Sequence, residues 1–387
     1  MQDRMLTNWI SSVNKSVLLL GPRQVGKSTL VKQLEPDVYV NLAVESFFLA
    51  YAKDPDLLRR ELEANRSAAL IAIDEIQRVP ALLNSVQVLI DEGMGRRRFL
   101  LTGSSARKLR QSSVNLLPGR VILAYLDPLM ISELGDQFEL ERALRVGTLP
   151  GIFLDREMGE ETLGSYAELY LREEVRAESL MRNVGDYARF LDTAALLSGQ
   201  WINYSKVSSD TEIPKETIRR FFSILEDTLL IHRLCAFKPR EKSTRRVSQR
   251  DRFIFFDVGV RNAILGIHGQ KLSEEQKGSL FEQFMITQLI SLGRAMRKNW
   301  SFSAYRTNAG AEVDLVIERE DDIIGLEIKY GTRLSTSQTT GLESFAEYVG
   351  SYKPVKKWIC YRGDKPQRFN NGCEAYNYRD LFLQLMR

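Results

Sequence analysis

The chain has 387 residues, 44% of them hydrophobic, which is enough for the cores of two or three ordinary globular domains. Three widely spaced cysteines and two histidines exclude a disulfide framework and a zinc site of the usual spacing, so we expect a reducing, cytoplasmic compartment. No apolar stretch has the length of a signal-peptide core or of a membrane span, and we expect neither secretion nor membrane insertion.

The net charge of +4 is unevenly distributed along the chain. Residues 238–252 contain seven basic and two acidic side chains, so this segment carries +5 and the rest of the chain about −1. A local basic segment, rather than a positive charge spread over the whole protein, is what a contact with nucleic acid requires. A solvated loop is the plainer explanation of the same charges.

Residues 1–158 alternate between strand-like and helix-like segments. Strands are predicted at 16–20, 38–42, 70–73, 99–102 and 121–125, with helical patterns between them. Alternation of this kind predicts an α/β fold with a mainly parallel sheet.

The first strand runs into G-x-x-x-x-G-K-S, the phosphate-binding P-loop. Its glycines let several backbone N–H groups point at the phosphates, Lys27 reaches the β- and γ-phosphate oxygens, and the Ser28 hydroxyl ligates Mg²⁺. A helix that begins near Lys27 adds the positive end of its dipole. We therefore predict binding of ATP and Mg²⁺ by Gly21, Pro22, Arg23, Gln24, Val25, Gly26, Lys27, Ser28 and Thr29.

Two further strands supply the other groups that hydrolysis of ATP needs. Strand 70–73 ends in Asp74, which can hold Mg²⁺ through its water ligands, and Glu75, which is placed to polarise the attacking water. Taken without the P-loop, the same pair would be an ordinary solvated strand end. The next strand leads to Thr102 and Ser104, either of which can sense the γ-phosphate.

An arginine contributed by a neighbouring subunit can stabilise charge in the transition state of phosphoryl transfer. Arg120, just before strand 121–125, is the candidate for this role, with Arg107 and Arg110 as alternatives. A solvated surface arginine is the plainer explanation.

From about residue 160 the pattern becomes helical, at 166–176 and 187–197. Between residues 204 and 256 it is a short helix, a turn with Pro214, a helix at 215–227 and two strand-like segments, 229–234 and 253–256, separated by the basic loop. This order predicts a winged helix. Contacts with DNA phosphates are expected from Lys215, Arg219, Lys238, Arg240, Lys242, Arg245 and Arg246. Many winged helices bind protein instead, so both partners stay open.

Beyond residue 266 the predicted order is helix, strand, strand, helix and strand. Alternation puts Asp314 on the face opposite Val313, and a turn at 319–322 would bring it beside Glu327 and Lys329, with Glu282 on the upstream helix aimed at the same sheet.

This set resembles the PD-(D/E)xK nuclease fold. In that chemistry Glu282, Asp314 and Glu327 would hold Mg²⁺ or Mn²⁺ on the scissile phosphate, and Lys329 would orient or deprotonate the attacking water. A half-exposed hairpin with a cross-strand ion pair is the structural alternative. A nuclease-like domain that binds without cleaving is another.

The chain as a whole resembles a family of prokaryotic AAA-type ATPases in which the ATPase core is followed by a C-terminal region of unknown function. Besides the P-loop, the resemblance is carried by residues 74–77, 101–105, 118–120, 171–175, 225–230, 255–259 and 305–307, continuing to Lys329. It covers nearly the whole chain and implies an ATPase that assembles into a homo-oligomeric ring or filament. We divide the chain into an AAA-type P-loop ATPase domain at 1–158, a helical and winged-helix domain at 159–265, and a PD-(D/E)xK nuclease-like domain at 266–387.

Three functions follow as hypotheses. The leading one is an ATP-hydrolysing protein that processes DNA, branched DNA included, with a metal-dependent nuclease-like domain. The second is a nucleotide-controlled oligomeric switch whose nuclease-like domain binds without cleaving. The third is a DNA motor that moves junctions without cutting them.

Overall fold

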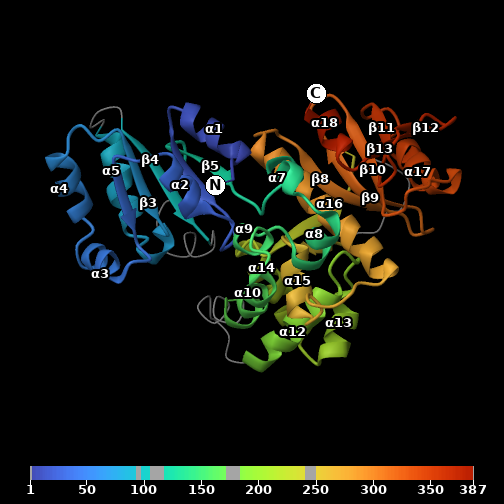
Figure 1. Ribbon diagram of the computed structural model, residues 1–387, viewed down its shortest axis with the longest axis horizontal. Helices are drawn as coiled ribbons and strands as arrows, with labels where there is room; N and C mark the ends of the chain where they lie inside the picture. The colour runs from blue at the N-terminus through green and yellow to red at the C-terminus, as the bar shows by residue number, and fades with distance from the viewer. Residues whose placement is uncertain (1, 93–96, 105–116, 171–183, 240–249, 387) are drawn as a thin grey trace. The chain divides into compact units, whose positions relative to one another are not determined.

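The computed structural model describes residues 2–92, 97–104, 117–170, 184–239 and 250–386 (Figure 1). Contacts group the chain into two compact units. Unit 1 comprises Met1–Leu129, Ser223–Leu230 and Arg294–Met296, and unit 2 comprises Met130–Phe222, Ile231–Gly293 and Arg297–Arg387. The three expected domains, 1–158, 159–265 and 266–387, stay a prediction, because the two units do not follow those boundaries.

Unit 1 is built on a five-stranded, all-parallel sheet with the order β2-β3-β4-β1-β5. The α/β class with a parallel sheet is thereby confirmed, and each predicted strand agrees with the observed one to within one residue at either end. The elements in chain order are α1 (Met5–Ser12), β1 (Ser16–Leu20), α2 (Lys27–Gln33), β2 (Val38–Asn41), α3 (Glu45–Lys53), α4 (Leu57–Ala64), β3 (Leu70–Asp74), the 3₁₀ turn η1 (Ile76–Arg78), α5 (Leu82–Asp91), β4 (Arg98–Gly103) and β5 (Val121–Tyr125).

Both faces of this sheet are covered. Leu18 and Leu20 of β1 share one hydrophobic core with Leu58 of α4 and Val86 of α5. Leu19, which points to the opposite face, is equally buried, and α2 lies on that side (Figure 1). Strands that are buried on both faces are typical of parallel sheets. Since parallel strands end at the same edge, the loops after β1, β3 and β4 meet there, with β1 and β3 on either side of β4.

Unit 2 contains an eight-stranded mixed sheet with the order β12-β13-β11-β10-β9-β8-β6-β7. The elements of the chain from α7 to α15 are α7 (Ile131–Leu134), η2 (Gly135–Gln137), α8 (Leu140–Val146), α9 (Pro150–Phe153), α10 (Gly159–Ser165), the π-helical turn η3 (Tyr166–Tyr170), α12 (Val184–Leu196), α13 (Tyr204–Thr211), α14 (Lys215–Asp227), β6 (Ile231–Ala236), β7 (Arg252–Phe255) and α15 (Val258–Ile264). They are followed by α16 (Glu274–Ala295), β8 (Ser301–Arg306), β9 (Glu312–Glu318), β10 (Ile323–Lys329), η4 (Thr336–Thr339), α17 (Thr340–Val349), β11 (Val355–Tyr361), β12 (Gln367–Arg368), β13 (Glu374–Asn377) and α18 (Asp380–Met386). The last turn of α14, from Ser223, is grouped with unit 1.

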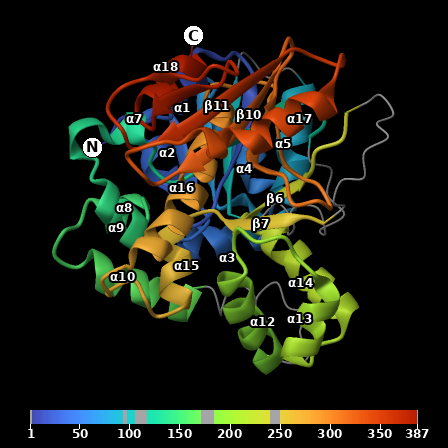
Figure 2. The same ribbon diagram turned by 90° about the vertical axis from the view of Figure 1, so that its right-hand side faces the viewer.

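Helix α13, the turn with Pro214, helix α14 and the antiparallel pair β6–β7 follow in the order that the sequence predicts for a winged helix. Helices α12, α13 and α14 lie together (Figure 2), and Phe222 of α14 packs between Phe190 of α12 and Phe253 of β7. The strand pair is not a separate ribbon, however. Strand β6 also pairs in parallel with β8 through Cys235 and Ala236, so β6 and β7 form one end of the large sheet.

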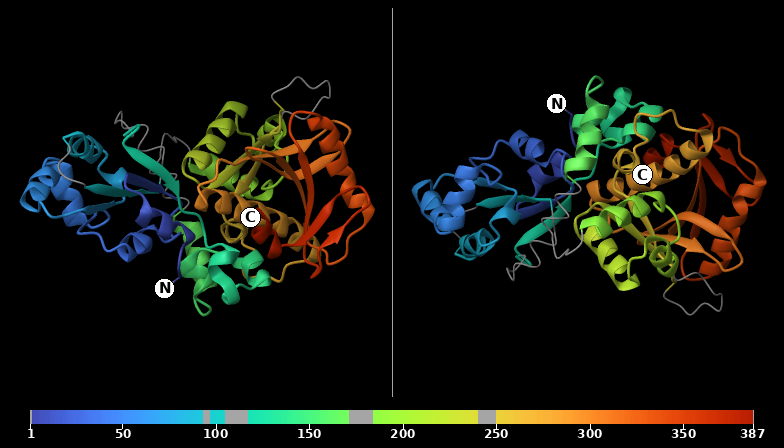
Figure 3. Two further views of the ribbon diagram at one scale, coloured as in Figure 1. Left: turned by 90° about the horizontal axis from the view of Figure 1, so that it is seen from above. Right: turned by 90° about the horizontal axis from the view of Figure 1, so that it is seen from below.

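Beyond residue 266 the structure has one more strand before α17 than the predicted order allows. Helix α16 is followed by β8, β9 and β10. Strand β8 is missing from the prediction; its sequence alternates polar and apolar residues only over four positions, 301–304, and only Ala304 and Tyr305 of its six residues are buried. The turn between β9 and β10 lies at the expected residues 319–322, and the two strands are antiparallel. Helices α17 and α16 lie on opposite faces of the sheet (Figure 3). Asp314 is therefore buried, not half-exposed.

Helix α15 is joined closely to the segment that ends α8. Asp257 caps α15 by accepting the N–H of Val260 at 3.0 Å, and its other oxygen accepts the N–H of Thr148 at 2.8 Å. Complete burial raises the pKa of Asp257 to about 6. A Cβ atom at position 259 would lie 2.0 Å from backbone atoms of Val146, so only glycine fits there. Asp257 and Gly259, two residues of the run that carries part of the family resemblance, thus have structural roles.

Candidate functional site

The P-loop connects β1 to α2 at the carboxyl edge of the unit 1 sheet. Gly26, the residue before α2, has a φ of 94°, a left-handed conformation that glycine adopts without strain. Lys27 is the first helical residue, as expected, and its buried Nζ donates 2.8 Å hydrogen bonds to the carbonyl oxygens of Gly21 and Pro22. The ammonium group is thus held at the mouth of the loop, beside the residues predicted to bind phosphate.

The loop is also braced from the N-terminus of the chain. The buried guanidinium of Arg4 donates to the carbonyl oxygen of Val25 at 2.7 Å and to that of Asp127 at 2.6 Å. Arg4 is not among the residues predicted from the sequence, because nothing in a local pattern links position 4 to the P-loop. It is a positioning residue for the loop.

Asp74 and Glu75 are fixed by the neighbouring strand. The Thr102 hydroxyl, on β4, donates to one carboxylate oxygen of Asp74 and accepts the N–H of Glu75 at 3.1 Å. The Tyr39 hydroxyl donates to the other oxygen of Asp74 at 2.9 Å, and burial, with the charge of Asp74, raises the pKa of Tyr39. Asp74 is only 1% exposed. Glu75 has a φ of 60°, which is uncommon for a residue other than glycine and is found preferentially at functional sites.

Gln77 links Glu75 to the second sensor candidate. Its side-chain amide donates to a carboxylate oxygen of Glu75 and, at 3.0 Å, to the Ser104 hydroxyl. Thr102 is therefore hydrogen-bonded directly to Asp74. Ser104 is linked to Glu75 through the side chain of Gln77. The sensing roles of Thr102 and Ser104 stay predictions. Gln77 belongs to one of the motifs that carry the family resemblance, so the sequence marks this residue as a candidate. The sequence does not predict which residues Gln77 contacts.

Arg120 is paired within its own chain. Its guanidinium makes a two-pronged ion pair with Asp91 at the end of α5, with Nε 2.7 Å and Nη2 2.8 Å from the carboxylate oxygens. A role toward a neighbouring subunit's nucleotide would require this pair to open. Arg107 and Arg110 lie outside the described residues.

A cluster of charged side chains in unit 2, here called the carboxylate centre, consists of Glu282 on α16, Asp314 on β9, and Glu327 and Lys329 on β10. The sequence predicts this grouping. Lys329 Nζ lies 2.5 Å from Glu327 Oε1, and Asp314 Oδ2 accepts the N–H of Ile328 at 2.7 Å. Burial, with the charges of Glu282 and Glu327, raises the pKa of Asp314 well above its usual value. Burial raises the pKa of Glu327 too, although the charge of Lys329 opposes this shift.

The sequence does not predict the fifth member of this cluster, Arg252. This residue opens β7 and ends the basic segment, yet it is only 3% exposed. Its guanidinium pairs with the carboxylate of Glu282, donates to the carbonyl oxygen of Asp314 at 3.1 Å, and donates twice to that of Gly199 at 2.6 and 2.8 Å. Among the described residues, no three His, Cys, Asp or Glu side chains are arranged to hold a metal ion.

An open groove of about 820 Å³ adjoins the carboxylate centre within unit 2. Its walls include Arg252 and Glu282 together with Trp201, Arg306 and Glu312. The indole N–H of Trp201 donates to Glu312 at 2.6 Å, and Arg306 lies 3.7 Å from the same carboxylate. The groove is therefore lined by charged groups of both signs.

The residues predicted to contact DNA are only partly described. Lys215 and Arg219 are exposed on α14, where Ile218 and Leu225 face the core as expected, and Lys238 is exposed after β6. The Arg219 guanidinium lies 5.2 Å from the ring centre of Tyr204. The remaining expected contacts, Arg240, Lys242, Arg245 and Arg246, lie outside the described residues.

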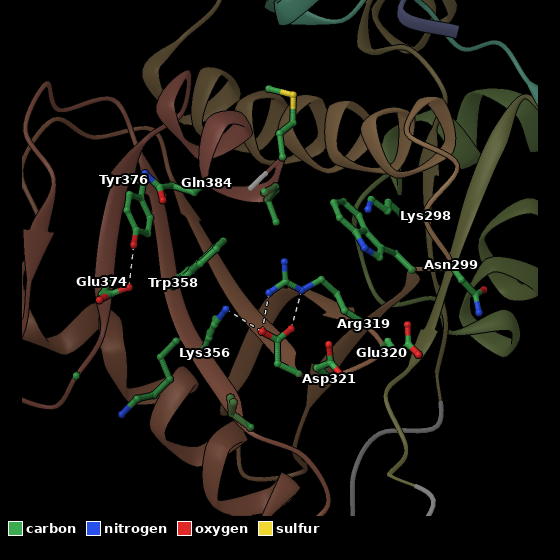
Figure 4. A pocket seen from close by; sticks show the side chains of 17 residues that line it. Lys298, Asn299, Arg319, Glu320, Asp321, Lys356, Trp358, Glu374, Tyr376 and Gln384 are labelled. Atoms are coloured by element: carbon green, nitrogen blue, oxygen red, sulfur yellow. Dashed lines mark hydrogen bonds and ion pairs between the residues drawn. The ribbon is translucent and has the colours of Figure 1, made fainter. Parts of the chain in front are cut away.

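A second pocket, of about 870 Å³, lies at the other end of the β9–β10 hairpin (Figure 4). Asp322, in the turn, pairs with Arg319 at 2.6 Å and with Lys356 at 2.8 Å. On another wall Trp358 packs edge-on against Tyr376. Part of the charge that lines this pocket is thus neutralised within the Arg319, Asp322 and Lys356 group.

Several known proteins are similar to parts of this chain. An uncharacterized protein of Mycobacterium tuberculosis is 28% identical over 332 residues, which cover 84% of this chain and 72% of that protein. A STAND-class signal transduction ATPase with a tetratricopeptide repeat sensor, from Pyrococcus horikoshii, is 16% identical with a TM-score of 0.24. The match covers 75% of this chain and 46% of that one, so the chain spans less than half of that structure. The replication initiator DnaA, solved with AMPPCP and single-stranded DNA, is 13% identical with a TM-score of 0.28, covering 57% of this chain and 86% of that one.

Three family models match consecutive segments of the chain. Residues 13–135 match an AAA domain, residues 137–271 a domain of unknown function (DUF8612), and residues 277–381 another domain of unknown function (DUF4143). Together with the parallel sheet and the P-loop, the first match identifies the N-terminal part of the chain as an AAA-type P-loop ATPase domain. Within the described parts of the chain, no helix combines the length and the apolar character that a membrane span needs.

Proposed function

We propose that the protein binds and hydrolyses ATP at the carboxyl edge of the unit 1 sheet. The observation that carries this proposal is the double hydrogen bond of Thr102, on the strand next to the P-loop strand, which holds Asp74 and the backbone of Glu75 in a fixed arrangement. A carboxylate that is already oriented costs little reorganisation when the reaction begins.

The residues divide the work as follows. Lys27 would exchange its bonds to two loop carbonyls for the β- and γ-phosphate oxygens. Ser28 and Asp74 offer oxygen ligands, which suit Mg²⁺, and the ion would neutralise charge on the phosphates. Glu75 would accept a proton from the attacking water.

Two variants test this proposal. Lys27→Ala should abolish saturable binding of labelled ATP, whereas Glu75→Gln should still bind ATP and hydrolyse it at least about 100-fold more slowly, because only the proton acceptor is lost. Lys53→Ala, an exposed lysine on α3, is the matched control. Absence of saturable ATP binding by the folded wild-type protein would refute the proposal.

We further propose that unit 2 contacts DNA through the exposed basic side chains Lys215, Arg219 and Lys238. Their common charge on one segment of the fold supports phosphate contacts, whose strength falls steeply with added salt. The charge reversals Lys215→Glu and Arg219→Glu should weaken binding to linear, forked and four-way DNA at low salt, and Lys53→Glu should not. Equal binding by all three variants would exclude this surface.

The contacts of Arg252 favour, as a second candidate, the nucleotide-controlled switch with a non-cleaving nuclease-like domain. Size measurement by light scattering with and without ATP tests it, because a switch that works through a homo-oligomer changes its subunit number. Native and denaturing gels of the same DNA panel, with ATP and Mg²⁺ or Mn²⁺, separate it from the other hypotheses. A motor would move strands, and a nuclease would cut them in a way that Asp314→Ala abolishes.

A further inference from the structure

We infer that Arg252 is the resident cation of the carboxylate centre and that its guanidinium takes the place of a divalent metal ion. The resemblance to metal-dependent nucleases implies Mg²⁺ or Mn²⁺ bound to Glu282, Asp314 and Glu327. The observed contacts of these three carboxylates do not leave a binding site for such an ion.

Each of the three carboxylates already has a protein donor. Glu282 pairs with the Arg252 guanidinium, Asp314 accepts the N–H of Ile328, and Glu327 pairs with Lys329. A small divalent ion needs several oxygens that converge on one point, and among the described residues no three Asp, Glu, His or Cys side chains do so. Only Glu327 keeps a buried oxygen, Oε2, that has no hydrogen-bond partner.

Arg252 is also held too firmly to act as a temporary occupant. In addition to its ion pair with Glu282, its three guanidinium nitrogens donate hydrogen bonds to the carbonyl oxygens of Gly199 and Asp314. Its Cζ atom lies 5.8 Å from the ring centre of Trp201. Its backbone is fixed as well, by pairing with Leu234 of β6 and with Trp201. To admit a metal, the guanidinium would have to leave these acceptors and remain charged in a buried place, which is costly.

Positive side chains already offset most of the negative charge of this centre. Glu282, Asp314, Glu327 and the nearby Glu312 face Arg252 and Lys329, with Arg306 at the edge of the groove. A guanidinium is planar and permanently charged, so it satisfies several oxygens at once. An added divalent cation would meet two positive groups already in place. This centre is thus built to stay closed to metal, and it does not cleave DNA by metal-assisted hydrolysis.

Direct metal binding tests the inference without relying on activity. Nucleotide-free, full-length protein is titrated with Mn²⁺, and the free ion is followed by electron paramagnetic resonance. Wild type and the isosteric variant Asp314→Asn should bind the same amount of Mn²⁺. Arg252→Gln, which removes the cation but keeps a polar side chain, should gain one site at least about tenfold tighter than any in the wild type. Arg252→Lys, which keeps a positive charge, should gain none, and the double variant Arg252→Gln, Asp314→Asn should lose the gained site.

Two results would overturn the inference. One is Mn²⁺ binding by the wild-type protein that Asp314→Asn abolishes, and this comparison holds even if Arg252→Gln does not fold. The other is a folded Arg252→Gln variant, checked by circular dichroism and thermal melting, that gains no site. Neither result bears on ATP hydrolysis, so the proposal for unit 1 stands or falls separately.

Discussion

The hydroxyl group of Thr102 on β4 donates a hydrogen bond to the carboxylate of Asp74, which ends the neighbouring strand β3. Both side chains are buried, and Thr102 is fully so. An unpartnered carboxylate in such a place is costly, so this bond fixes the direction of Asp74 and also satisfies one of its oxygens.

We expect Thr102→Val, which keeps the shape of the side chain and removes its hydroxyl, to lower the turnover of ATP by about 100-fold, because a shift of the catalytic groups by an ångström has effects of that size. Thr102→Ser should retain most of the activity. Steady-state hydrolysis and equilibrium ATP binding measure the two effects separately. If the valine variant hydrolyses ATP as fast as the serine variant, Thr102 has no part in positioning Asp74 and Glu75.

A second prediction concerns the bridge that Gln77 makes between Glu75 and Ser104. Gln77→Met keeps the length of the side chain and removes both donors, so Glu75 loses its orienting contact and turnover should fall by about tenfold with little change in KM. Ser104→Ala removes only one end of the bridge and should have a smaller effect. Identical turnover in Gln77→Met and wild type would show that Glu75 is oriented by its backbone alone.

The Arg120–Asp91 pair allows the two explanations of Arg120 to be separated. A solvent-exposed ion pair contributes little to stability, so Asp91→Ala should change neither the melting temperature nor the ATPase rate by much. If Arg120 reaches the nucleotide of a neighbouring subunit, Arg120→Ala should lower turnover by about 1,000-fold. Rates measured over a range of protein concentrations show whether a second subunit is needed. Equal, small effects of the two variants would remove Arg120 from the list of catalytic residues.

The buried carboxyl of Asp257 predicts a pH dependence of stability. Its pKa in the folded protein, about 6, lies above that of an unfolded aspartate, so the protonated form is favoured by folding and stability is lost as pH rises through 6. Relative to Asp257→Asn, which does not titrate, the wild-type protein should lose about 1 kcal/mol of unfolding free energy between pH 5 and pH 7. Urea unfolding of both proteins at these two pH values gives the difference. A difference that is constant with pH would mean that the carboxyl titrates normally.

The sequence predicts unit 1 well, because its strands are short apolar runs whose ends carry the functional motifs. The positions of Lys27, Asp74 and Glu75 at one edge of the sheet follow from strand direction alone. The braces could not be predicted. Arg4 and Tyr39 reach the site across the fold, and no local pattern connects either residue to its partner.

In unit 2 the carboxylate centre is predictable from the β9–β10 hairpin, but its cation is not. Arg252 belongs to a basic segment whose charge alone suggests a solvated loop or a DNA contact. Arg252 is buried because β6 pairs with β8, and this pairing joins the end of the basic segment to the sheet that carries Asp314. A long-range strand pairing of this kind leaves no signal in the composition of either strand.

The pairing of β6 with β8 also determines how a force on the β6–β7 hairpin would be transmitted. Strand β8 lies between β6 and β9, so whatever pulls on the β6–β7 hairpin pulls, through backbone hydrogen bonds, on the neighbour of the strand that bears Asp314. Hinge-like swinging of the hairpin alone would have to break the ladder at Cys235 and Ala236. A load applied by a bound partner would instead travel sideways through the sheet and arrive at the buried charges within three strands.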